Sequence, residues 1–146
     1  MISNKCNYAL RALLELAKRE GAGPATIVDI AQAQQMPSRF LEAILRQLKQ
    51  SGLTDSLRGK HGGYVLARPA REITVGEVIR LIEGPLFALE RAEAGSRLAA
   101  APDDVFESLW QDAETALNEV FDAVTLADLA EKDRERANNF VLDYTI

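Results

Sequence analysis

The cations between residues 38 and 60 form two groups that could bind an anionic polymer. Arg39 and Arg46 stand about two helical turns apart, so a helix here would present both on one face. Arg58 and Lys60 follow within a run rich in glycine, which is typical of a hairpin tip. Guanidinium and ammonium groups bind phosphate oxygens, and an arginine can bind guanine through two hydrogen bonds. These residue types and spacings favour binding of nucleic acid.

Two short helices joined by a tight turn would position the first group. Thr26 and Asp29 have the spacing of a capping box, which starts the first of these helices. Pro37 cannot continue that helix and ends it. A second helix is predicted over residues 38–50, because its apolar residues recur three and four apart and Gly52 follows it. The residues expected to contact DNA from this helix are Ser38, Arg39, Phe40, Glu42, Arg46 and Lys49.

A glycine-tipped hairpin is predicted directly after these helices, with strands at about 53–58 and 64–67. A helical pair followed by a basic hairpin is the pattern of a winged helix-turn-helix, in which a helix enters the major groove. The hairpin tip can then reach flanking phosphates or the minor groove. The alternative is a helical hairpin beside an unrelated surface ribbon. The residues expected to contact DNA from the wing are Arg58, Gly59, Lys60, Gly62, Gly63 and Tyr64.

Several of these stretches carry a signature that continues over most of the chain. It includes Phe40-Leu41-Glu42, Gly52-Leu53, Ser56-Leu57-Arg58-Gly59, Gly62-Gly63-Tyr64 and the stretches 8–13, 73–79, 83–85 and 125–129. The chain thereby resembles the Rrf family of winged-helix regulators, of the IscR, NsrR and CymR type. The resemblance implies a mainly α fold with a small β-hairpin wing and a long C-terminal dimerisation helix. It also implies a homodimeric transcription regulator of double-stranded DNA, which we expect to be a repressor of the CymR kind.

The charge distribution fits this expectation better than the net charge of −5 does. Residues 1–71 hold 11 Lys/Arg and 5 Asp/Glu, whereas residues 72–146 hold 6 and 17. A basic N-terminal half is suited to face phosphates, and an acidic C-terminal half is suited to face away from them. The chain has no run of about 20 apolar residues and no signal-like start, so we expect a cytoplasmic protein without membrane contact.

Cysteine content limits what the protein can bind. Relatives with an iron–sulfur cluster carry three cysteines in the region that corresponds to residues 86–101, where this chain has none. Cys6 is the single cysteine, so a family-type cluster is excluded by ligand count, and Cys6 with His61 does not make a metal site. We therefore expect no cofactor. Cys6 lies on an apolar helical stripe over residues 3–19, which favours a buried side chain over a redox thiol.

A long helix over about 103–123 is expected to pair two copies of the chain. Its apolar residues alternate spacings of four and three, the pattern of a coiled-coil seam. A core-facing amphipathic helix is the alternative, but a partner helix covers so wide a stripe more easily. The expected dimer residues are Phe106, Trp110, Ala113, Leu117, Val120 and Val124.

The sequence predicts four regions. Residues 1–84 would form the DNA-binding domain, with a helix over 74–83; residues 85–101 a linker; residues 102–137 the dimerisation helices; and residues 138–146 a tail. The last helix is expected to end near 138–139. The last four residues of this tail are Asp143, Tyr144, Thr145 and Ile146, and apolar residues precede them. It resembles the C-terminal peptide with which serine acetyltransferases fill the active site of O-acetylserine sulfhydrylase. The alternative is a strap packed on the dimer.

The resulting hypothesis is a DNA-binding regulator, with control of cysteine and sulfur metabolism through docking of the tail to O-acetylserine sulfhydrylase. A regulator that senses a thiol oxidant or a small molecule is the alternative, as is a protein-interaction module acting through the tail. An enzyme is not expected, because the chain has one histidine, one cysteine, no phosphate-binding loop and no nucleophile elbow.

Overall fold

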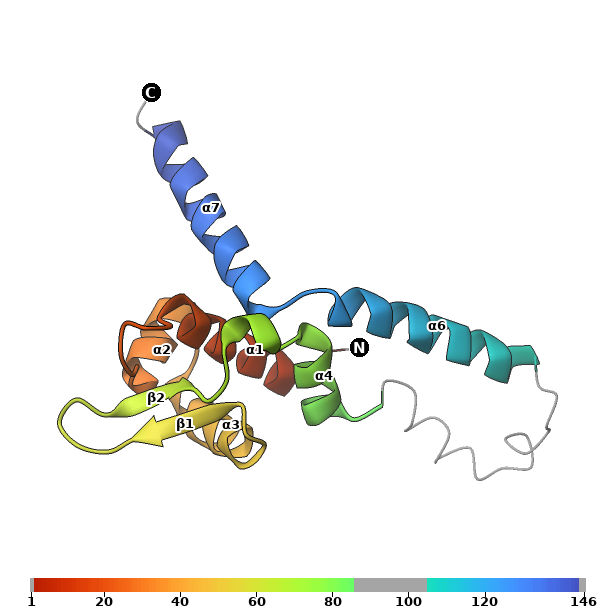
Figure 1. Cartoon of the computed structure of the whole chain (residues 1–146), viewed down its shortest axis with the longest axis horizontal. Coiled ribbons are helices and arrows are strands. Elements are labelled where there is room, and N and C mark those ends of the chain that lie inside the picture. Colours follow the sequence, from red (N-terminus) through yellow and green to blue (C-terminus); the bar gives the residue numbers. More distant parts are fainter. Residues whose placement is uncertain (1, 86–104, 145–146) are drawn as a thin grey trace.

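The computed structural model describes residues 2–85 and 105–144 of the chain (Figure 1). It is mainly α-helical with one antiparallel pair of strands, which confirms the predicted fold class. Most of the predicted linker, 85–101, and the expected start of the long helix lie outside the described residues. The elements are α1 (Asn4–Lys18), α2 (Ile27–Gln34), α3 (Ser38–Gln50), β1 (Thr54–Leu57), β2 (Gly63–Leu66), the 3₁₀ turn η1 (Ala70–Glu72), α4 (Val75–Glu83), α6 (Val105–Asp122) and α7 (Leu126–Tyr144).

The sequence predicts a capping box at each of three helix starts, from the spacing of residues 26 and 29, 74 and 77, and 125 and 128, and two of the three form completely. At α2, Asp29 N–H donates to Thr26 Oγ1 at 3.1 Å and Thr26 N–H donates back to the Asp29 carboxylate at 2.9 Å. At α7, residues 125 and 128 make the same two bonds. At α4 only half of the box forms, because the Glu77 carboxylate binds the guanidinium of Arg68 at 2.6 Å. The spacing alone predicts a complete capping box at α4, but Arg68 competes for the Glu77 carboxylate.

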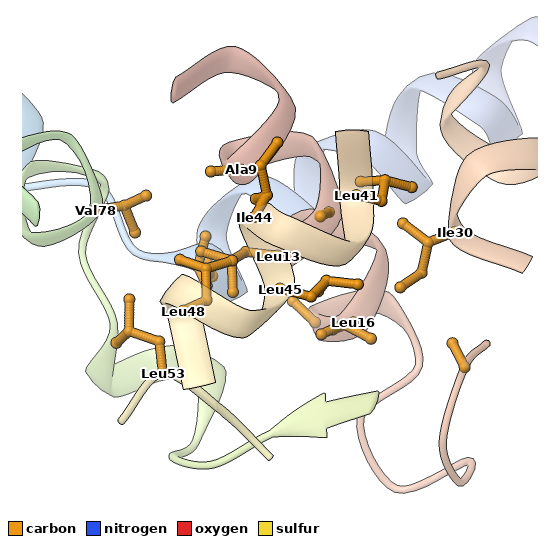
Figure 2. Close-up of a cluster of buried hydrophobic side chains, with 14 of the residues drawn as sticks. Ala9, Leu13, Leu16, Ile30, Leu41, Ile44, Leu45, Leu48, Leu53 and Val78 are labelled. Atoms are coloured by element: carbon orange, nitrogen blue, oxygen red, sulfur yellow. The ribbon is translucent and has the colours of Figure 1, made fainter. Parts of the chain in front are cut away.

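The core of the winged domain forms where α1, α2 and α3 meet (Figure 2). Helix α3 places Leu41, Ile44, Leu45 and Leu48 against α1, and all four are buried. Leu13 of α1 is completely buried among them. Fully burying one such side chain stabilises a fold by about 1.5–3 kcal/mol. This packing fixes α3 so that its opposite face points to solvent.

The wing is held against the start of α2 by its returning strand. β1 and β2 pair with Thr54 opposite Leu66 and Leu57 opposite Gly63. Tyr64 N–H donates to the Ala25 carbonyl at 2.8 Å, and Ala25 N–H donates back at 3.0 Å. This bridge adds a short third segment to the hairpin. The wing is therefore tied to the helix-turn-helix at its base, while its tip extends beyond.

The two C-terminal helices leave the winged domain in different directions (Figure 1). Val75 N–H donates to the Val124 carbonyl, and Leu126 N–H donates to the Ile73 carbonyl, both at 2.9 Å. Leu126 and Ala130 are buried in the core of the winged domain, so the first turns of α7 belong to that core. None of the residues of α6 is buried.

Helix α7 also differs from its predicted end. It continues to Tyr144 rather than ending near residues 138–139, because no proline or glycine interrupts it there. In the described part of the chain, no helix is both long enough and apolar enough to cross a membrane.

Candidate nucleic-acid interface

The solvent face of α3 presents the polar side chains that the sequence assigned to DNA contact. Arg39, Phe40, Glu42 and Arg46 are exposed, as are Ser38 and Lys49 at the two ends of the helix. A helix fits the major groove of B-DNA, and its first turns are the part that reaches base edges in helix-turn-helix proteins. The position of Arg39 in the first turn of α3 suits it for that role.

Arg39 is held by an aromatic stack that begins on α1. Its guanidinium carbon lies 4.7 Å from the centre of the Phe40 ring, a cation–π contact. The Phe40 ring in turn stacks on Tyr8 of α1, with centroids 6.2 Å apart and planes 13° from parallel. Phe40 nevertheless remains 44% exposed. Phe40 was expected to contact DNA from α3, and no local sequence pattern indicates that its ring stacks on a residue of α1.

The remaining charges of α3 have local partners. Arg46 Nη2 donates to Glu42 at 3.1 Å across one helical turn, and both side chains are about two-thirds exposed, so the pair contributes little to stability. Lys49 Nζ donates to Ser56 Oγ of β1 at 2.6 Å. This bond joins the end of α3 to the wing. The two elements that would contact DNA therefore touch each other through this exposed bond.

The tip of the wing presents two exposed cations, Arg58 and Lys60. Among the described residues, neither has an ion-pair partner, so both can meet phosphate without breaking a contact. Gly62 and Gly63 follow, and a Cβ on either would collide with backbone; at Gly63 it would lie 2.5 Å from the Ala25 carbonyl oxygen. Gly63 also has φ of +149°, which favours glycine. The two glycines predicted for the turn thus permit the close backbone path of the wing. The backbone bonds between Tyr64 and Ala25 hold the wing at its base.

Helix α6 carries the residues that the sequence assigned to the dimer. Phe106, Trp110, Leu117 and Val120 are between 39% and 62% exposed, and Phe106 stacks on Trp110. Ala113 is half-buried. Val124 lies beyond the end of the helix at Asp122, so the seam periodicity does not reach it. These exposed apolar side chains recur along one face of α6, a feature that is common at protein–protein interfaces.

Comparison with known proteins identifies the class of this winged helix. A family model described as Rrf2, iron-dependent transcriptional regulator, matches residues 2–132. The chain belongs to the Rrf2 family. It is 38% identical over 129 residues to the HTH-type transcriptional regulator CymR of Bacillus subtilis, covering 88% of both chains. It is 31% identical to IscR of Escherichia coli O1:K1, covering 88% of this chain and 78% of that one.

Solved structures agree with these sequence matches. The structure of IscR from T. potens has a TM-score of 0.77 and 36% identity, over 94% of this chain and 90% of that one. The structure of CymR, named the global cysteine regulator of B. subtilis, also has a TM-score of 0.77 and 36% identity. This match covers 90% of this chain and 97% of that one. The protein is therefore a helix-turn-helix transcription regulator, and the relatives confirm that it is not an enzyme.

The Rrf2 description includes iron, yet the donor set of this chain does not fit a thiolate-bound cluster. Cys6 is the one cysteine in the sequence, and its side chain is completely buried on α1. Burial, reinforced by the negative charge of Glu83, raises the pKa of the Cys6 thiol to about 11. A buried, protonated thiol is a poor metal ligand and a poor redox sensor. Groups of three or more His, Cys, Asp or Glu side chains suited to a metal are absent from residues 2–85 and 105–144.

The tail residues of this Rrf2 protein divide between described and undescribed parts of the chain. The backbone of Asp143 and Tyr144 forms the end of α7. Thr145 and Ile146 lie outside the described residues. Helix α7 points away from the winged domain (Figure 1). Phe140 and Val141 near its end are 64% and 61% exposed. The end of α7 therefore presents exposed apolar side chains beyond the winged domain.

Proposed function

We propose that this Rrf2 protein is a sequence-specific repressor that binds DNA as a two-fold homodimer. In each protomer, α3 enters the major groove, and Arg58 and Lys60 of the wing contact phosphates or the minor groove. The observation that carries this proposal is the exposed polar face of α3, joined to a basic wing by the bond between Lys49 and Ser56. Residues 1–84 serve DNA binding, and the protein acts in the cytoplasm, where it reaches DNA.

The dimer forms through residues 102–137, with α6 as its principal helix. The support is the exposed apolar strip of α6, since a symmetric pairing of two such strips would remove both from water. Two-fold pairing also predicts a two-fold operator. The centres of its half-sites are expected about one helical turn of DNA, or a multiple of it, apart.

A gel shift with DNA from upstream of the protein's own gene, together with sedimentation, tests this function. We expect the wild type to sediment as a dimer at micromolar concentration and to shift this DNA at lower concentrations than unrelated DNA. Leu117→Asp places a charge in the apolar strip and should give folded monomers that bind DNA poorly. Thr115→Asp is the matched control, because residue 115 is exposed but lies off the seam. A monomeric wild type, or equal effects of the two variants, would contradict the dimer.

The regulated genes are proposed to belong to cysteine and sulfur metabolism. The support is the similarity to CymR, whose structure is described as that of a global cysteine regulator. In this proposal the tail, with Asp143, Tyr144, Thr145 and the carboxylate of Ile146, docks into O-acetylserine sulfhydrylase. A free carboxylate beside an apolar side chain is the kind of group that backbone amides capture. Abundant O-acetylserine would displace the tail, and scarce O-acetylserine would permit docking.

A calorimetric titration of a peptide with residues 142–146 into the sulfhydrylase tests the docking. We expect saturable binding that O-acetylserine competes away, and loss of binding when Ile146 is deleted. Operator DNA should change the affinity of the regulator for the enzyme by the same factor as the enzyme changes its affinity for DNA. Absence of binding at millimolar peptide would remove the sulfhydrylase from this proposal and leave the repressor untouched.

A further inference from the structure

A hollow of about 420 Å³ lies between the first turns of α1 and α3, beside the DNA-binding face. Figure 1 shows the two helices next to each other. Its volume falls within the range of small-molecule sites, about 300–1,000 Å³. The residues that line it are Asn4, Lys5, Tyr8, Arg39, Phe40, Ala43 and Ile44.

The lining combines aromatic faces with cations. Tyr8 and Phe40 supply two stacked rings, and residue Phe40 is 44% exposed to solvent. Lys5 and Arg39 also line the hollow, and among the described residues neither has a carboxylate within ion-pair distance. Aromatic rings of a ligand prefer offset stacking on such faces, and a carboxylate binds most strongly to unpaired guanidinium and ammonium groups. The surface is therefore complementary to a molecule that has both an aromatic ring and a negative charge.

We propose that this hollow binds a small aromatic carboxylate, which competes with operator DNA for Arg39. The ligand ring would stack on Phe40, and the carboxylate would bind Lys5 and Arg39. Arg39 now covers the Phe40 ring from 4.7 Å, so the ligand would displace the guanidinium from the position that faces DNA. A guanidinium held over the hollow by the ligand carboxylate would not reach a guanine in the major groove. Binding of the ligand would therefore weaken operator binding, and operator DNA would weaken ligand binding by the same factor.

The competition rests on the proposed role of Arg39 in DNA binding, but occupation of the hollow does not. A titration of the full-length protein with phenylacetate, followed by backbone amide NMR, tests occupation directly. We expect saturable shifts confined to residues 4–8 and 39–44. Phenylacetamide lacks the charge and acetate lacks the ring, and each should bind about tenfold or more weakly than phenylacetate, the effect of losing one charge-assisted contact or one aromatic stack.

Two variants separate the site from general charge effects. Lys5→Gln removes one carboxylate partner and should weaken phenylacetate binding about tenfold. Arg11→Gln is the control, since Arg11 is an exposed cation of the same helix that does not line the hollow, and it should bind phenylacetate as the wild type does. Absence of saturable shifts, shifts centred on α6, or equal effects of both variants would overturn the site. A further outcome is that the shifts of residues around the hollow follow the protein concentration and not the phenylacetate concentration. That result would show that a second copy of the chain occupies the hollow, and it would overturn the proposal of a small-molecule ligand.

Operator binding in the presence of phenylacetate tests the competition. Fluorescence anisotropy with labelled operator should show a lower affinity at saturating phenylacetate, and no change with phenylacetamide at the same concentration. Shifts in the hollow without any change in operator affinity would overturn the competition. A protein that binds no operator even without phenylacetate would instead contradict the proposed function, while the NMR titration would still decide whether the hollow is a site.

Discussion

Arg80 of α4 donates to both carboxylate oxygens of Asp122 at the end of α6, at 2.8 and 3.2 Å. It also donates to Asn118 at 3.1 Å, one turn earlier on α6. Gly76 allows this contact, because a Cβ there would collide with the Asp122 carboxylate. The winged domain and the proposed dimer helix therefore meet in a fixed orientation, which in a two-fold dimer would set the distance between the two α3 helices.

Loss of this ion pair should relax the required spacing of half-sites. We expect Arg80→Ala to remain dimeric and to bind operators lengthened or shortened by one base pair nearly as well as the natural one. The free energy of unfolding should change by less than about 1 kcal/mol, because both side chains are more than two-fifths exposed. Anisotropy with a series of operator spacings measures this. The charge-swapped variant Arg80→Asp with Asp122→Arg should regain part of the preference, and a wild-type spacing profile for Arg80→Ala would contradict the idea.

Arg39→Ala should reduce sequence discrimination. If Arg39 binds guanine bidentately, the variant should distinguish the natural operator less well from an operator substituted at that position. The difference between the two binding free energies should shrink by about 1–3 kcal/mol. Arg39→Lys is the informative comparison, since lysine keeps the charge and lacks the planar fork. It should preserve most of the affinity for unrelated DNA and lose the discrimination. Competition binding across single-base operator variants measures both, and unchanged discrimination in Arg39→Ala would place another residue at the bases.

Arg58→Ala should alter the salt dependence of operator binding. One phosphate contact contributes about one unit to the slope of log affinity against log salt, so the slope should become shallower by about one. Arg136→Ala serves as control, because Arg136 is an exposed cation on α7, far from the wing along the chain. Equal slopes for wild type and Arg58→Ala, measured between about 50 and 200 mM salt, would place the wing away from phosphate.

Glu15 should make stability depend on pH below its ordinary pKa of 4.5. Its side chain is buried between α1 and α2. Burial alone would raise its pKa, but hydrogen bonds from Arg19 at 2.8 Å and Gln34 at 2.9 Å outweigh that effect, so the pKa of Glu15 is lowered. A lowered pKa in the folded state means stabilisation that is present above pH 4.5 and is lost as pH falls through the folded value.

Glu15→Gln tests this linkage. At pH 7 the variant should lose about 1–3 kcal/mol of unfolding free energy, because it removes a charged acceptor from two part-buried hydrogen bonds. Its stability should then fall less than that of the wild type as pH decreases below 4.5. Urea unfolding at a series of pH values measures both effects. Glu135→Gln, on the exposed side of α7, is the control, and a wild-type acid profile for Glu15→Gln would refute the role of Glu15.

The sequence by itself determined the elements whose signals lie within a few residues. The bounds of α3 matched residues 38–50, because its apolar spacing and the flanking Pro37 and Gly52 act within one or two turns. The capping boxes of α2 and α7 formed for the same reason. The glycine-rich wing was also predictable, since Gly62 meets a backbone constraint of the hairpin itself: a Cβ there would collide with the Leu57 carbonyl oxygen. The side chains that face DNA in the proposal follow from that local register.

The tertiary structure alone decided which distant groups meet. The predicted capping partner Glu77 was taken by Arg68, nine residues away, and Phe40 stacks on Tyr8 of another helix. Arg80 and Asp122 are 42 positions apart, and no local pattern pairs them. A charge on a helix surface is compatible with several neighbours until packing of the core fixes the helix axes. Such contacts depend on the mutual placement of α1, α3 and α4, which is set by burial of apolar side chains. The placement of α6 depends instead on the backbone bonds that join residues 73 and 75 to residues 126 and 124.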